Sequence, residues 1–162
     1  MEEILRRVQE NRRLTSFLKL LSPLTAVLSI LALGYLAVIS VRASLLSLLE
    51  LCVILGVPFF AVTLIRRRIN APRPYELYDF YKIAPKKKSG LSFPSRHAYS
   101  AFAIGTALCL ECPLLGGILL VFSAMMCGAR VLLGIHFLRD VLTGAIVGSV
   151  SVIIGKLIFS LV

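Results

Sequence analysis

Ionisable residues gather at three points of this sequence, each near the beginning or end of an apolar segment. The three groups are Arg66 with Arg73-Pro74, Pro94-Ser95-Arg96-His97, and Arg130 with His136 and Asp140. The sequence contains two histidines, and both belong to these groups. Because ionisable side chains are costly to keep beside membrane-spanning segments, this concentration of them indicates a functional site.

His136 and Asp140 are separated by one helical turn. If they share a helix, they lie on the same face, and the carboxylate can accept a hydrogen bond from one imidazole nitrogen. That bond would fix the tautomer and leave the other nitrogen free to attack an electrophile. The same spacing also occurs in purely structural or helix-capping arrangements, so the pair by itself does not establish catalysis.

Three arginines, Arg66, Arg73 and Arg130, are predicted to bind a phosphoryl group. A guanidinium binds phosphate oxygens in pairs and stays charged, so the three together could neutralise a phosphoryl group and its transition state. Arg67 and Arg68 are interpreted instead as charges that flank a membrane span.

Ser95 and His97 lie where an apolar segment begins. A serine hydroxyl and free backbone N–H groups at a helix N-terminus form an anion site. His97 would face the same anion and could protonate a leaving oxygen, which is the general acid that a nucleophilic His136 needs. The alternative is a helix cap beside an interfacial histidine.

The elements that carry these groups are predicted to be transmembrane helices. The chain has 162 residues, 58% of them hydrophobic, and its mean hydropathy of +0.90 is too high for an ordinary soluble domain. We therefore expect an all-α integral membrane protein with a single domain over residues 1–162. Five apolar runs are predicted to span the bilayer: Phe17–Ile39, Ala43–Ile65, Ala98–Cys112, Leu114–Leu133 and Val141–Val162.

The remaining segments are a start and a loop. Residues 1–16 are predicted to form a tail or an interfacial helix, and residues 66–96 a loop that carries the first two groups. The third run is short, but a helix surrounded by protein need not match the bilayer alone. If every run crosses once, alternation brings all three groups to one membrane face.

The charge distribution bears on partners and on the side of the membrane. The net charge of +10 is not accompanied by the pattern of an RNA-binding module, so we expect no nucleic acid partner and attribute the charge to lipid headgroups. Basic residues concentrate before the first run and after the second, which favours a cytoplasmic position for the site.

Taken together, the three groups resemble the motifs of the type-2 phosphatidic acid phosphatase superfamily. Its motifs are a basic residue, six positions and Arg-Pro; then Pro-Ser-Gly-His; then Ser-Arg, five positions, His, three positions and Asp. This chain matches every spacing. It departs in three residues, with Arg66 in place of lysine, Arg96 in place of glycine and Ala129 in place of serine.

The resemblance implies a membrane-embedded lipid phosphatase that needs no metal or other cofactor. His136 would form a phosphohistidine, Asp140 would orient it, and His97 would be the acid for the leaving group and later the base for water. The residues that would hold the phosphoryl oxygens are Arg66, Arg73, Ser95, Arg96 and Arg130. The compact chain is most similar to bacterial members, which implies a multi-pass protein of the plasma membrane.

Several alternatives stay open at this point. Phosphatidic acid, phosphatidylglycerophosphate and a polyprenyl diphosphate are all candidate substrates. The rival functions are a non-catalytic protein that binds anionic lipid and a small transporter or channel subunit. Gly144 and Gly148 allow close helix packing, either within the chain or in a homodimer. The four cysteines are predicted to be buried, inert thiols.

Overall fold

The computed structural model describes residues 8, 10–78 and 89–161 of the chain. Its helices are α2 (Arg12–Ala43), α3 (Leu45–Ile69), α4 (Pro74–Leu77), α5 (Arg96–Glu111), α6 (Pro113–Leu132) and α7 (Leu138–Ser160). This described part contains no strand, which confirms the predicted all-α class.

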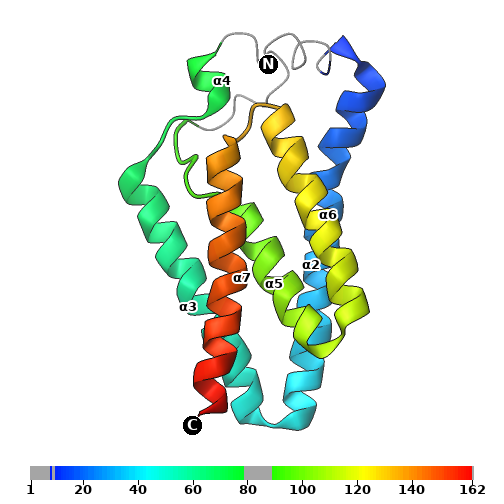
Figure 1. Ribbon diagram of the computed structural model, residues 1–162, viewed down its shortest axis with the longest axis vertical. Helices are drawn as coiled ribbons and strands as arrows, with labels where there is room; N and C mark the ends of the chain where they lie inside the picture. Colours follow the sequence, from blue (N-terminus) through cyan, green and yellow to red (C-terminus); the bar gives the residue numbers. More distant parts are fainter. Residues whose placement is uncertain (1–7, 9, 79–88, 162) are drawn as a thin grey trace.

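All five predicted apolar runs form helices that pack as a bundle (Figure 1). Four of them, α2, α3, α6 and α7, are long and apolar enough to cross a membrane. The fifth, α5, has 16 residues and a length of about 24 Å, less than the hydrocarbon thickness. It contacts all four long helices, so protein surrounds it where lipid would otherwise meet a short helix.

Two predicted boundaries are wrong. Helix α2 begins at Arg12, so residues 12–16 continue the helix of the first span and form neither a tail nor a separate interfacial helix; the Asn11 side chain caps the helix by accepting from the Leu14 amide at 3.1 Å. Helix α3 continues to Ile69, where Asn70 ends it in the left-handed conformation. Arg66 therefore projects from the last helical turn and not from a loop.

Close packing of α7 on α5 depends on two glycines. A Cβ atom at Gly144 would lie 2.5 Å from the carbonyl oxygen of Ser95, and one at Gly148 would lie 2.5 Å from that of Tyr99. Both glycines thus serve packing within the chain. This contact fixes the start of α5 against the start of α7, where the second and third motif groups lie.

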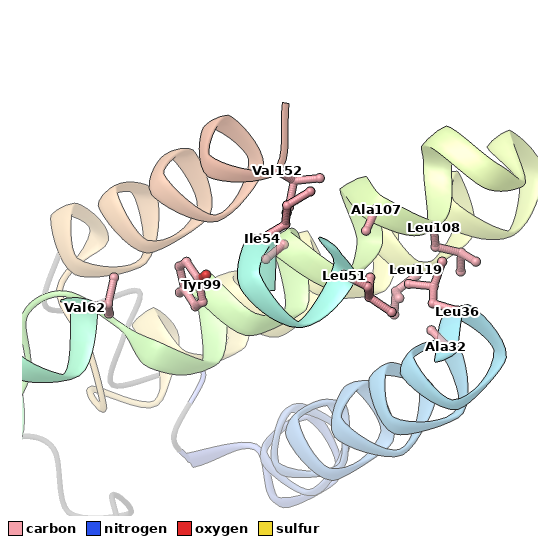
Figure 2. Close-up of a cluster of buried hydrophobic side chains, with 11 residues drawn as sticks. Ala32, Leu36, Leu51, Ile54, Val62, Tyr99, Ala107, Leu108, Leu119 and Val152 are labelled. Atoms are coloured by element: carbon pink, nitrogen blue, oxygen red, sulfur yellow. The ribbon is translucent and has the colours of Figure 1, made fainter. Parts of the chain in front are cut away.

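The core is a set of buried apolar side chains between the helices, shown in part in Figure 2 with Tyr99 of α5, Leu36 of α2 and Val152 of α7. Most outward positions are large and apolar as well, as lipid contact requires. For the same reason the prediction of buried cysteines is wrong for three of the four. Cys127 is buried, whereas Cys52 is exposed and Cys109 and Cys112 are partly exposed.

Candidate active site

The site lies at the end of the bundle where α2 and α7 begin and α4 is located (Figure 1). The turn between α6 and α7 is closed by the Arg130 carbonyl, which accepts from the amides of Ile135 at 2.9 Å and His136 at 3.2 Å. Asp140 lies in the first turn of α7 and accepts from the Phe137 amide at 3.0 Å. These bonds fix the backbone on both sides of the predicted nucleophile.

The tautomer of His136 follows from its neighbours. Ser92 donates its single hydroxyl proton to Asp140 Oδ2 at 2.5 Å. The Ser92 oxygen, 3.3 Å from His136 Nδ1, must therefore accept, so Nδ1 carries the hydrogen. Nδ1 also lies 3.5 Å from Asp140 Oδ2. The lone pair is thus on Nε2, which has no hydrogen-bond partner among the described residues.

The environment keeps His136 neutral. The side chain is 1% exposed, and burial lowers its pKa to about 4, with Arg130 and Arg73 acting in the same direction and Asp140 against it. At neutral pH the imidazole is therefore uncharged, with its one hydrogen on Nδ1. A neutral imidazole with a free Nε2 is the form that can attack phosphorus.

The three predicted phosphate-binding arginines are buried at the same end of the bundle, each less than 10% exposed. Arg66 Nη1 donates to the Pro94 carbonyl at 3.1 Å, and Arg73 Nε donates to the Gly90 carbonyl at 2.9 Å. Neutral oxygens thus orient these two guanidinium groups without cancelling their charges.

Arg130 completes the arginine cluster. Its Nη1 donates to Ser22 Oγ on α2 at 3.2 Å, and its Nε is buried without a partner among the described residues. Within this part of the chain, none of the three arginines forms an ion pair with a carboxylate. Buried positive charges without counter-ions are costly, so the cluster is suited to an anionic ligand.

The second motif group divides between two environments. Ser95 is fully buried, caps α5 through the Ala98 amide at 3.5 Å, and donates its own amide to the Asp140 carbonyl at 3.0 Å. His97, in the first turn of α5, is exposed and lines a cavity. Arg130 and His136 are close enough to His97 for their charges to affect its protonation.

The Arg96 side chain leaves the arginine cluster. Its guanidinium stacks over the Phe59 ring of α3, 5.9 Å from the ring centre, where a cation–π contact holds it. Of the predicted phosphate-binding side chains, Arg96 is the one that the structure turns toward the neighbouring cavity.

Two residues of the site are not predicted by the sequence motifs. Ser92 bonds both His136 and Asp140, and nothing in its sequence context distinguishes it. Glu76 accepts from the Arg73 amide at 3.1 Å and from the Gly90 amide at 2.7 Å, so it joins the two segments that orient Arg73. The spacing of Glu76 from Arg73 is that of a capping box, a signal that could have revealed it.

Comparison with known proteins agrees with this arrangement. The family model described as the PAP2 superfamily matches residues 47–161. The crystal structure of LpxE from Aquifex aeolicus has a TM-score of 0.73 and 25% identity, with 95% of this chain and 93% of that chain covered. No curated protein matches the chain.

A second solved structure shares the fold alone. It is the first transmembrane PAP2-type phosphatidylglycerolphosphate phosphatase from Bacillus subtilis, with a TM-score of 0.62 and 21% identity. The alignment covers 99% of this chain and 93% of that chain.

Proposed function

The chain belongs to the PAP2 superfamily of membrane phosphatases, and we propose that it hydrolyses a lipid phosphate or diphosphate through a phosphohistidine on His136. The observation that carries the proposal is the combination of a neutral, buried imidazole with three buried arginines; among the described residues, its Nε2 has no hydrogen-bond partner and the arginines have no carboxylate partner. A phosphoryl group would supply both the electrophile for the imidazole and the counter-charge for the arginines.

In the first step, His136 Nε2 attacks phosphorus and the bond from phosphorus to the leaving oxygen breaks. His97, which takes up a proton when the negative charge of the substrate is bound beside it, gives that proton to the leaving oxygen, so the lipid leaves as an alcohol or a monophosphate. The N-phosphorylated ring of His136 is cationic, and Asp140 with Ser92 stabilises its Nδ1–H. Arg66, Arg73 and Arg130 hold the equatorial oxygens throughout.

In the second step, water attacks the phosphohistidine. His97, now neutral, takes a proton from the water, and the bond from Nε2 to phosphorus breaks. Inorganic phosphate leaves, and both histidines return to their starting states. Because three guanidinium groups already supply the positive charge that the transition state needs, we propose that the reaction requires no metal ion.

Phosphate release from detergent-purified protein tests this proposal. The panel is phosphatidic acid, phosphatidylglycerophosphate and a polyprenyl diphosphate, each with and without EDTA, for the wild type and His136→Ala. We expect EDTA-resistant release that the variant loses. Release that stops with EDTA would refute the metal-free mechanism. No release by folded wild-type protein would favour a non-catalytic protein that binds anionic lipid.

The covalent intermediate has a separate test. With His97→Ala, leaving-group protonation and water activation both slow, so a diphosphate substrate with a good leaving group should still phosphorylate His136 and then stall. Acid-labile, alkali-stable label on the protein would report the phosphohistidine. Label that persists in the double variant His97→Ala/His136→Ala would place the nucleophile elsewhere.

We propose that the site faces the cytoplasm of a bacterial cell. The support is the basic residues at the site end, including Arg12, Arg13, Arg67 and Arg68. The test starts from a variant in which the native cysteines are replaced, and introduces one cysteine at Leu77 of α4, a position that is 56% exposed. This cysteine should not react with a membrane-impermeant thiol reagent added to intact cells. A cysteine at Ser44, at the opposite end, should react. The reverse pattern would place the site outside.

A further inference from the structure

A cavity of about 310 Å³ begins beside His97 and continues between α2 and α5. Its walls come from α2, α3, α5 and α6, and they are mostly apolar. The exceptions besides the motif residues are hydroxyl groups, from Ser22, Thr25 and Ser29 of α2 and Ser100 of α5. The cavity therefore joins the predicted general acid to a row of hydroxyls inside the bundle.

The three hydroxyls of α2 have different partners. Their spacing of three and four residues puts them on one helix face, with Ser29 about 10 Å further into the bundle than Ser22. Ser22 accepts from Arg130, and Thr25 donates to the carbonyl of Leu21 at 2.8 Å. Ser29 Oγ is buried and has no partner in the described part of the chain.

An unpartnered hydroxyl at this position points to a ligand. Ser29 is 8% exposed, and a buried donor without an acceptor costs stability that a ligand oxygen would recover. Ser29 also lines the cavity that contains His97. An acceptor that the substrate carries inward of its phosphate would meet this hydroxyl.

Beyond the hydroxyls the surroundings become almost wholly apolar. A second cavity of about 510 Å³ shares wall residues with the first, namely Leu33, Phe59, Ser100 and Ile104. At the rim, Ile30 is 68% exposed and Leu33 is 40% exposed, so the first cavity opens toward the lipid phase. From the site inward, the protein therefore presents first the arginines, then the hydroxyl groups and then apolar side chains.

We propose that the cavity between α2 and α5 binds the acyl linkage of the substrate, with the Ser29 hydroxyl donating to an ester or amide carbonyl. This rests on the proposed phosphatase function and narrows its substrate. A lipid whose phosphate-bearing group carries acyl chains presents phosphate, carbonyl and hydrocarbon in the same order as the protein presents their partners. A polyprenyl diphosphate has no carbonyl and would leave Ser29 without an acceptor.

The test compares two substrates that differ in the carbonyl alone and adds an isoprenoid diphosphate as a third. Dioleoyl phosphatidic acid, its ether-linked dialkyl analogue and farnesyl diphosphate are assayed in mixed micelles, and kcat/KM is measured for each. We expect the wild type to prefer the ester over the ether, and Ser29→Ala to reduce the ester-to-ether ratio roughly three- to tenfold, the typical effect of one hydrogen bond. Thr25→Val is the matched control, because that hydroxyl already has protein acceptors, the Leu21 carbonyl at 2.8 Å and the Phe122 carbonyl at 3.4 Å, and it should keep the wild-type ratio.

The outcomes separate this inference from the function on which it rests. An unchanged ester-to-ether ratio in Ser29→Ala, or an equal change in Thr25→Val, would overturn the role of Ser29. Wild-type turnover of farnesyl diphosphate as efficient as that of the ester would overturn the acyl preference while supporting the phosphatase. Failure to release phosphate from all three substrates would overturn the proposed function itself.

Discussion

Replacing Ser92 by alanine tests whether the hydroxyl that sequence motifs do not reveal is part of the catalytic apparatus. Ser92 is fully buried, donates to Asp140 Oδ2 at 2.5 Å and accepts from His136 Nδ1 at 3.3 Å. The substitution removes both bonds. Asp140 keeps its bond from the Phe137 amide, so the carboxylate stays in place while the imidazole loses one of its two orienting contacts.

The size of the effect follows from the charge that develops on the donor, the His136 imidazole. A hydrogen bond to a charged group contributes about 1.5–3 kcal/mol, and each 1.4 kcal/mol in the barrier is about tenfold in rate. If the bond acts mainly when His136 becomes cationic, kcat should fall roughly 10- to 100-fold. KM should change little, because the Ser92 hydroxyl is occupied by Asp140 and His136 and does not bind phosphate oxygens.

The assay is steady-state phosphate release from the preferred lipid, with folding checked by thermal melting. Ser123→Ala is the matched control, since Ser123 is equally buried but, within the described part of the chain, bonds only the Leu119 carbonyl of its own helix at 2.7 Å. It should keep wild-type kcat. A folded Ser92→Ala protein with wild-type kcat, or one that changes KM alone, would refute the positioning role.

Three further predictions concern stability. Gly148→Ala should cost about 1–3 kcal/mol by thermal unfolding, because its methyl would meet an α5 carbonyl at 2.5 Å, whereas Gly117→Ala, with nothing within 4 Å, should not destabilise. Lys156→Met should cost about 1 kcal/mol, since Lys156 lies 3.1 Å and 3.7 Å from two glutamates of α3 and α5; melting of Lys156→Arg should match the wild type. Burial lowers the His136 pKa from 6.5 to about 4, so the unfolded chain binds this proton at a higher pH than the folded chain does. The free energy of unfolding, measured by thermal melting at a series of pH values, should therefore fall by roughly 3 kcal/mol as the pH falls between these two values. His136→Asn should lack this share of the loss.

The fold and the convergence of the motif groups could be predicted because the membrane constrains both. A bilayer requires apolar runs of about 20 residues with all backbone groups bonded internally, so hydropathy alone indicates the helices. Alternation of those helices then brings Arg66, His97 and His136 to one end of the bundle. The bond from Arg66 to the Pro94 carbonyl at 3.1 Å is direct evidence of that convergence.

The contacts between the motifs could not be predicted in the same way. Ser92 and Glu76 lie in the polar segment between α3 and α5, where no periodicity reports which side chains turn inward. Helix ends were missed because caps such as Asn70 are single-residue events. Burial of cysteines was misjudged because an apolar neighbourhood in sequence can mean contact with lipid as well as with protein.

The three departures from the family motifs are compatible with an active enzyme. Arg96 is the first residue of α5 and has helical backbone, so the position requires no glycine, and its side chain stacks on Phe59 outside the arginine cluster. Arg66 bonds the Pro94 carbonyl through Nη1, which leaves its other guanidinium nitrogens for an anion. Ala129 is 1% exposed and packed in the core, where the missing hydroxyl is replaced by apolar contact. None of the three substitutions alters the bonds that hold His136 in its reactive tautomer.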